Sequence, residues 1–150
     1  MRIQLIAAAL FLSAALMLAA LPAAAQSDDE VHGRIEALHG NAEAFTEPFR
    51  RLTQAMRDGD AASLADLCDY PLSVNANGES YDVQTAEGLV ENFNSLVMQQ
   101  TRDAVADQSY GALFVNSDGV MLADGAVWMS AVCDDDDCST SHWAVIGINN

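Results

Sequence analysis

The cysteines near the C-terminus are the residues whose spacing most clearly predicts chemistry. Cys133 and Cys138 flank four consecutive aspartates, residues 134–137, between two runs typical of β-strands. Directly opposed residues of an antiparallel strand pair lie about 4.5 Å apart at Cα when they do not exchange hydrogen bonds, which is within disulfide range. We therefore expect a Cys133–Cys138 disulfide at the tip of a hairpin. Cys68 is left over, and we expect a free, buried thiol there.

The histidines and the aspartate run do not have the spacing of a metal site. Consecutive aspartates at a turn point in different directions, whereas a calcium loop alternates its ligands around a fixed glycine. His32 and His39 would stand about 10 Å apart along one helix, and His142 has no partner at ligand spacing. The chain also lacks a G-x-S-x-G elbow, a phosphate-binding glycine loop and a dinucleotide fingerprint. We predict no metal and no cofactor.

The predicted hairpin also implies a register. If Cys133 faces Cys138, Met129 faces His142 and Trp128 faces Trp143. One face would then be apolar and pack on a helix, with His142 at its polar end as the best pocket candidate. The other face would pair the two tryptophans outside the core, which indicates a partner surface and a homodimer through the sheet.

The first 25 residues are typical of a secretory signal peptide. Arg2 precedes an apolar run from Ile3 to Leu21, and Pro22 and three alanines follow. A retained membrane anchor is the alternative, because this run is long enough to cross a bilayer core of about 30 Å. The proline and the small-residue site favour cleavage. We expect an exported protein, periplasmic or secreted, with no membrane contact after cleavage.

The remaining 125 residues have the length of one domain and a strongly acidic composition. They carry 22 acidic residues against five arginines and no lysine, for a formal charge of −17. Such a surface repels phosphate backbones and anionic lipid, which excludes nucleic-acid binding and work at a membrane surface.

Apolar periodicity predicts helices first and strands last. Steps of three and four residues predict a partly helical extension over 26–44 and a helix over 45–57, and a second buried stripe predicts a helix over 87–99. Asp60 is expected to cap a short helix. A strand pair turns at Asn77-Gly78, and everything after Ser109 is expected to be strand, in runs over 112–115, 126–132 and 140–148. This order is α+β. The side chains expected to be buried on the helices are Phe49, Leu52, Met56, Leu89, Phe93, Leu96, Val97 and Ala104.

Four segments of the chain resemble a known superfamily. Residues 59–64, 69–72, 113–115 and 119–128 are similar to the NTF2-like (cystatin-like cone, SnoaL-like) superfamily, particularly its small exported members. The resemblance covers residues 45–150. It implies N-terminal helices packed on a strongly curved antiparallel sheet, with a cone-shaped pocket used for isomerase or hydratase chemistry, ligand binding or dimerisation.

The resemblance also directs attention to the end of the first strand. Ketosteroid isomerases of this superfamily carry an aspartate base just before the turn that ends this strand, and matching that turn to Gly78 places Asn75 there. An amide cannot act as a general base. Asp69 and Tyr70 remain as candidates near the strand entrance. The candidate pocket therefore comprises Asp69, Tyr70, Asn75, Met129 and His142, and no catalytic residue is assigned.

Three functions stay open at this stage. The first is a non-enzymatic exported binding or accessory domain for a small organic ligand or a protein partner. The second is an enzyme doing acid/base chemistry of the isomerase or dehydratase type, with Asp69, Tyr70 or His142 as the proton carrier. The third is a homodimeric interaction module. Fold alone does not decide between them.

Overall fold

Three helices open the part of the chain that the computed structural model describes, residues 26–150. They are α1 (Asp28–His39), α2 (Glu43–Asp58) and α3 (Ala61–Ala65). Ser27 and Glu30 form a capping box at the start of α1, and the side chain of Asp60 caps α3. The helix expected over 45–57 is confirmed within α2, with Leu52 and Met56 buried and Phe49 half-buried. The signal peptide predicted over residues 1–25 lies outside the described residues.

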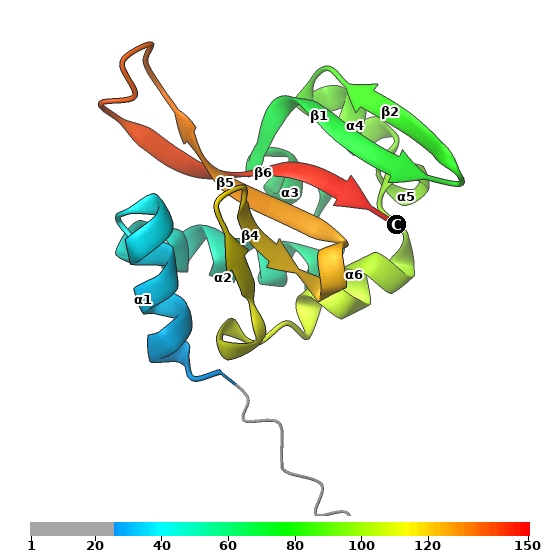
Figure 1. The fold of residues 1–150 in the computed structure, drawn as a ribbon. Coiled ribbons are helices and arrows are strands. Elements are labelled where there is room, and N and C mark those ends of the chain that lie inside the picture. Colours follow the sequence, from blue (N-terminus) through cyan, green and yellow to red (C-terminus); the bar gives the residue numbers. More distant parts are fainter. Residues whose placement is uncertain (1–25) are drawn as a thin grey trace, which may run out of the picture.

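The strands form one mixed sheet of six, in the order β2-β1-β6-β5-β4-β3 (Figure 1). Their bounds are β1 Cys68–Ala76, β2 Glu79–Val83, β3 Phe114–Asn116, β4 Gly119–Leu122, β5 Val127–Cys133 and β6 Ser141–Asn149. The α+β class is confirmed. The sheet is not wholly antiparallel, because β1 and β6 run parallel while every other neighbouring pair is antiparallel. No helix in residues 26–150 is long and apolar enough to cross a membrane.

The helix expected over 87–99 is broken into short pieces. The chain forms α4 (Ala86–Glu91) and α5 (Phe93–Leu96), becomes extended at Val97, and continues as α6 (Gln99–Ala106). At the first break the Asn92 side-chain amide donates to the Gly88 carbonyl at 2.9 Å, a local bond of the kind that competes with helix continuation. Leu89, Phe93 and Leu96 are buried as expected. The expected burial of Ala104 is wrong, because it lies on the exposed side of α6.

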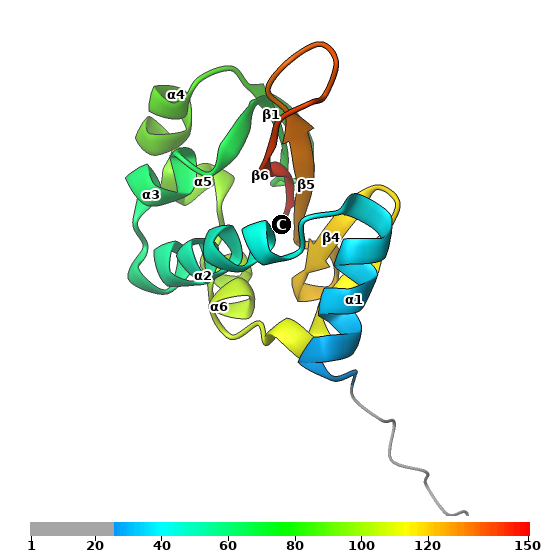
Figure 2. The same cartoon turned by 90° about the vertical axis from the view of Figure 1, so that its left-hand side faces the viewer.

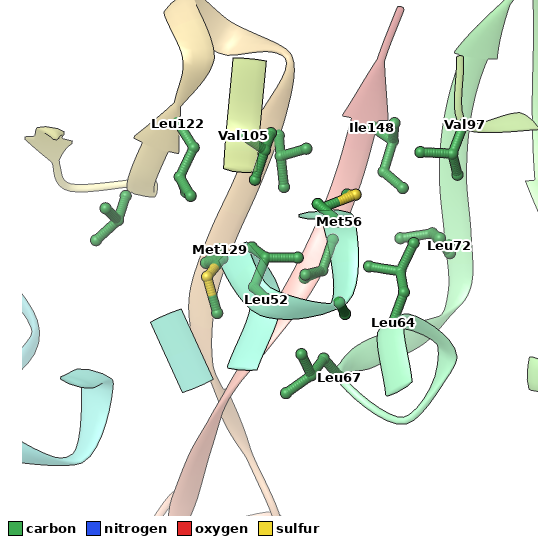
Figure 3. Close-up of a cluster of buried hydrophobic side chains, with 14 of the residues drawn as sticks. Leu52, Met56, Leu64, Leu67, Leu72, Val97, Val105, Leu122, Met129 and Ile148 are labelled. Atoms are coloured by element: carbon green, nitrogen blue, oxygen red, sulfur yellow. The ribbon is translucent and has the colours of Figure 1, made fainter. Parts of the chain in front are cut away.

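The expectation that everything after Ser109 is strand is wrong at two 3-10 helices, η1 (Tyr110–Ala112) and η2 (Ala123–Gly125). At η2 the backbone cannot be extended, because Ala123 and Asp124 both have positive φ, 48° and 55°. Helices α2 to α6 lie on one side of the sheet, as Figure 2 shows with the sheet close to edge-on. The core lies between these helices and the sheet, where Leu52 and Met56 of α2 meet Leu72, Met129 and Ile148 of the strands (Figure 3).

The hairpin register expected from the cysteines is wrong, although the disulfide itself is confirmed. Cys133 faces Ser141, and Ala131, not Trp128, faces Trp143. The reason is that Cys138 does not belong to β6: it lies in the loop with a φ of 53°, and the disulfide closes within that loop. From Cys133 to Met129 the pairing is shifted by three residues, an odd number, which exchanges the expected faces and turns Trp143 and Val145 inward. Beyond the irregularity between Met129 and Trp128 the shift is four, and Ile148 keeps its expected place in the core.

Trp143 consequently belongs to the core. Its ring lies 4.8 Å from that of Phe45 and 5.4 Å from that of His39, both in edge-to-face contact. The expected tryptophan pair on the outer face therefore does not exist. Trp128 faces Gly147 instead and is half-buried.

Candidate functional site

The five residues expected to line a common pocket are not brought together. Met129 is fully buried in the core and faces Val145. His142 is exposed on the hairpin, where its Nδ1 lies 2.5 Å from a carboxylate oxygen of Asp134. Asn75 is exposed near the far end of β1, about 20 Å along the strand from Asp69 at the rise of an extended chain. This set does not form a site.

At the start of β1, Tyr70 makes a hydrogen bond to the backbone, and Asp69 has no hydrogen-bonded titratable partner among residues 26–150. The Tyr70 hydroxyl donates to the Ala65 carbonyl at 3.0 Å, and burial, together with the neighbouring Cys68, raises the pKa of this phenol. A phenol with a raised pKa stays protonated and is a poorer base at neutral pH. No side-chain hydrogen bond links Asp69 to Tyr70 or to another titratable group among residues 26–150.

Cys68 is the free thiol that was expected. Its Sγ donates to the Leu64 carbonyl at 3.2 Å, and burial raises its pKa to about 12. The thiolate, not the thiol, is the nucleophile, so this cysteine is held in its unreactive form. The residue packs against the core as a small apolar side chain.

The space between α2 and the sheet is filled. Leu122, Val127, Met129 and Ile148 of the sheet are fully buried, as is Leu52 of α2. No buried side-chain nitrogen or oxygen in residues 26–150 lacks a hydrogen-bond partner. These apolar side chains belong to the hydrophobic core between α2 and the sheet, where the resemblance implies a cone-shaped pocket.

A groove of about 430 Å³ lies beside β2, and we call it the β2 groove. This volume is within the range of ligand sites. Val83 and Leu96 supply buried apolar side chains, and β2, α4 and α5 form its walls. Its lining residues are Asn77, Tyr81, Asp82, Val83, Gln84, Thr85, Gly88, Asn92, Ser95 and Leu96.

Local sequence explains why the walls of the groove stand where they do. Asn77 and Gly78 both adopt positive φ, 56° and 79°, which gives the tight turn between β1 and β2. After β2, only Gln84 and Thr85 precede α4, and the Thr85 hydroxyl caps that helix by accepting from the Gly88 N–H at 3.1 Å. The short connection holds α4 beside β2.

Polar side chains around the groove are hydrogen-bonded within the chain. The Tyr81 hydroxyl donates to Glu79 at 2.7 Å, and this bond raises the pKa of the phenol. The Gln84 amide donates to the Asp82 carbonyl at 3.0 Å, and the Asn77 amide donates to the Ser95 carbonyl at 3.4 Å. The lining offers amide, hydroxyl and carboxylate groups for recognition, without a paired acid and base.

The sequence did not indicate this groove, because residues of these types are common at turns and helix caps. Asparagine, glutamine, serine and threonine around a turn and a helix cap are fully explained by local structure. The one indication present in the sequence was the expectation of a short returning strand after Gly78. That strand forms a groove wall only because the sheet ends there.

The outer face of the sheet carries an apolar row. Phe114 faces Met121 across one strand pair, and Met121 faces Trp128 across the next. Phe114 is 45% exposed, and the other two are half-buried. Trp128 thus lies on an outer surface as expected, with Phe114 and Met121 as its companions in place of Trp143.

Comparison with known proteins gives no match to a family model, to a curated protein or to a solved structure. Residues 26–150 also hold no group of three or more side chains arranged to bind a metal ion.

Proposed function

We propose that this protein is a non-catalytic binding domain whose ligand lies in the β2 groove. The observation that carries the proposal is the composition of the groove, which combines an apolar floor at Val83 and Leu96 with a rim of amides and hydroxyls. Ligand sites have this composition, with apolar contact supplying affinity and a few polar groups fixing orientation.

Several features support export of the domain. The Cys133–Cys138 disulfide is of a kind that persists in oxidising compartments, and the formal charge of −17 keeps a small domain soluble. Both fit the signal peptide predicted over residues 1–25. Membership of the NTF2-like superfamily is likewise a proposal. It is supported by the order of helices, a strand pair, further helices and a final antiparallel run.

Acid/base catalysis has less support as the function. It would need Asp69, Tyr70 or His142 beside a bound substrate, yet His142 lies on the exposed hairpin and Tyr70 donates to a backbone carbonyl. Neither side chain lines the β2 groove.

A screen of small organic fragments by protein NMR tests the proposal. Fragments that bind should shift the amide signals of Gln84, Ser95 and Leu96. Ser95→Phe, which places a ring in the groove, should abolish these shifts, whereas Ser117→Phe, an exposed serine in the β3–β4 turn, should not. Fragment shifts that survive in Ser95→Phe, or that lie elsewhere in the chain, would contradict the proposal.

A homodimer through the outer sheet face is a second candidate, favoured by the row of Phe114, Met121 and Trp128. Phe114→Ser should weaken self-association in sedimentation experiments while leaving the folded structure intact. Leu38→Ser, on an equally exposed leucine of α1, is the matched control. Sedimentation of the unaltered protein as a monomer at tens of micromolar would rule this candidate out.

A further inference from the structure

The outer edge of β2 presents backbone groups that no other strand uses. β2 is the last strand of the sheet and pairs only with β1. The tight turn at Asn77-Gly78 makes Ala76 and Glu79 a hydrogen-bonded pair, and such pairs alternate along an antiparallel ladder. The N–H and C=O groups of Ser80 and Asp82 therefore point away from β1.

The position of Gln84 agrees with this alternation. Its side-chain amide donates to the Asp82 carbonyl at 3.0 Å, so that carbonyl is directed outward and accepts a donor at the free edge. A side-chain amide from two residues further along the chain thus stands where the backbone of a neighbouring strand would donate.

The β2 groove runs along the same edge. Residues 81–84 are consecutive in its lining, which means that side chains of both faces of β2 border it. The opposite wall includes Gly88, which has no side chain to narrow the space. A neighbouring strand lies about 4.8 Å from its partner, so an extended backbone placed beside β2 would lie within this groove.

The charges around the groove favour a basic occupant. Asp82 lines the groove, and the Glu79 carboxylate accepts from the lining residue Tyr81 at 2.7 Å. None of the five arginines of residues 26–150 lines it. With a formal charge of −17, a second copy of this chain would be repelled from the same edge.

We propose that a basic, extended segment of a partner protein binds the β2 groove as a seventh strand beside β2. Alternate side chains of this segment would be apolar, against Val83 and Leu96, and lysine or arginine, on the side of Asp82. Main-chain bonds to Ser80 and Asp82 hold the segment, and the pockets and charges select its sequence. The inference rests on the proposed function and names the class of ligand for the same groove.

The first test uses a fluorescently labelled hexapeptide of alternating lysine and valine with blocked ends. Protein purified after expression of the full 150-residue chain is titrated into it at low salt, with anisotropy as the readout. We expect binding at least about tenfold tighter than for the glutamate–valine peptide, and weaker binding as salt is added. Equal affinity of the two peptides would overturn the inference.

N-methylation of the peptide tests strand addition while leaving the protein unaltered. Two isomers carry methyl groups on the odd or on the even backbone nitrogens. Only every second N–H of an added strand points toward β2, so one isomer should lose affinity by about tenfold or more and the other should retain it. Retention or loss of binding by both isomers alike would overturn strand addition.

Variants of the protein then locate the site. Asp82→Pro removes an N–H that β1 does not use, and it should weaken peptide binding about tenfold. Asp82→Asn tests the charge against Asp136→Asn, an exposed aspartate of the hairpin loop, and only the former should weaken binding. A Cβ at Gly88 would meet Thr85 and Val83 at ordinary distances of 3.5 and 3.7 Å, so Gly88→Ala should fold normally yet bind more weakly. Unchanged affinity in all three groove variants would overturn the inference.

The fragment screen separates this inference from the proposed function. Fragments that shift Ser95 and Leu96, together with peptides that show no difference between N-methyl isomers, would remove strand addition and leave the binding domain. If neither fragments nor peptides bind in the groove, both the strand-addition inference and the proposed binding function are wrong.

Discussion

The two edge strands of the sheet, β3 and β2, are covered to different extents. At the β3 edge the strand has three residues, α1 packs against it, and the His39 Nε2 lies 2.7 Å from the Asn116 carbonyl. At the β2 edge the strand has five residues, and its outward carbonyl at Asp82 accepts a hydrogen bond from the side-chain amide of Gln84. Exposed edges invite unwanted pairing unless they are covered. The β3 edge is therefore covered and the β2 edge is open, and an open edge is what the proposed strand addition requires.

The elements packed next to the two edge strands differ in the same way. Beside the β3 edge, four aromatic rings pack together, with the centroids of contacting rings 4.8 to 6.0 Å apart: Phe45, Phe49, Tyr110 and Trp143. Beside β2, the helices α4 and α5 are only six and four residues long, and they form the groove wall together with the strand. Aromatic pairs of this kind stabilise beyond the area they bury, so the covered end is expected to be the more rigid of the two.

Gly119→Ala should disrupt the covered edge most. Gly119 has a φ of 150°, and a Cβ there would lie 2.3 Å from the Met129 carbonyl oxygen, so β4 would have to separate from β5. We expect a loss of about 3 kcal/mol in the free energy of unfolding, measured by urea denaturation with tryptophan fluorescence.

The matched control for this substitution is Gly147→Ala in β6. A Cβ there would meet its nearest neighbour, the Ser73 carbonyl oxygen, at 3.8 Å, which is ordinary contact. The urea concentration at the midpoint of unfolding of this variant should stay near that of the unaltered protein. Equal losses in the two variants would show that close approach at Gly119 is not the cause.

Gly111→Ala should loosen the helix that covers the β3 edge. A Cβ on this residue of η1 would lie 2.7 Å from the Gln26 carbonyl oxygen and 2.9 Å from a carboxylate oxygen of Asp28. The start of α1 must move away, at an expected cost of about 1 to 2 kcal/mol in the free energy of unfolding. Hydrogen exchange of α1 amides should speed up.

Gly33→Ala provides the comparison within α1. Apart from its chain neighbours and the nearby backbone of α1, nothing lies within 4 Å of a Cβ built there, and alanine favours a helix over glycine by up to about 1 kcal/mol. This variant should be as stable as the unaltered protein or more so. Slower exchange in Gly111→Ala would contradict the contact inferred between η1 and the N-terminal segment.

His39→Ala should have a smaller effect, confined to the same edge. It removes the hydrogen bond to the Asn116 carbonyl and the ring contact with Trp143, and we expect a cost of about 1 kcal/mol. Leu38→Ala, at a residue that is 49% exposed, should cost less. Hydrogen exchange of β3 amides checks the assignment, because a change spread evenly over the sheet would show that His39 does not act at this edge.

The smallest effect is expected at the hairpin tip, which lies beyond both edges. Hydrogen bonds from the Ser139 hydroxyl, the Ser139 N–H and the Thr140 hydroxyl lower the pKa of Asp135 to about 2, from an ordinary value of 3.8. The folded pKa is the lower one, so this carboxylate stabilises the loop above about pH 4, and the contribution is lost as pH falls toward 2.

NMR signals of the Ser139 and Thr140 amides should therefore change between pH 4 and pH 2, with little change in the sheet. Asp135→Asn should remove this transition, whereas Asp136→Asn should leave it in place. A transition that persists in Asp135→Asn would assign it to another group.

Much of the local structure could be predicted from the sequence. The cap at Asp60, the turn at Asn77-Gly78 and the three C-terminal strand runs were all expected, because each depends on a few neighbouring residues. The helix α6 was missed, and a long helix was expected where two short ones and an extended residue stand. The spacing of apolar residues alone does not show where a helix with a buried face is interrupted.

The candidate site could not be predicted in the same way. The expected register assumed that two bonded cysteines are opposed strand residues, but Asp135 organises a loop that contains Cys138 and moves the start of β6 to Ser141. The β2 groove depends on contacts between segments still further apart in the sequence, namely the parallel pairing of β1 with β6. That pairing occupies one side of β1 and leaves β2 as the last strand.

The sequence by itself determined where the capped helices α3 and α4 begin, where β1 turns into β2, which cysteines bond and how acidic the chain is. These properties depend on neighbouring residues or on composition. Tertiary structure alone decided that Trp143 is core, that Met129 and His142 lie apart, and that β2 has an open edge. The physical reason is that strand side chains alternate between faces, so an odd shift of register exchanges inside and outside, and no local pattern specifies the pairing of strands that are distant in the chain.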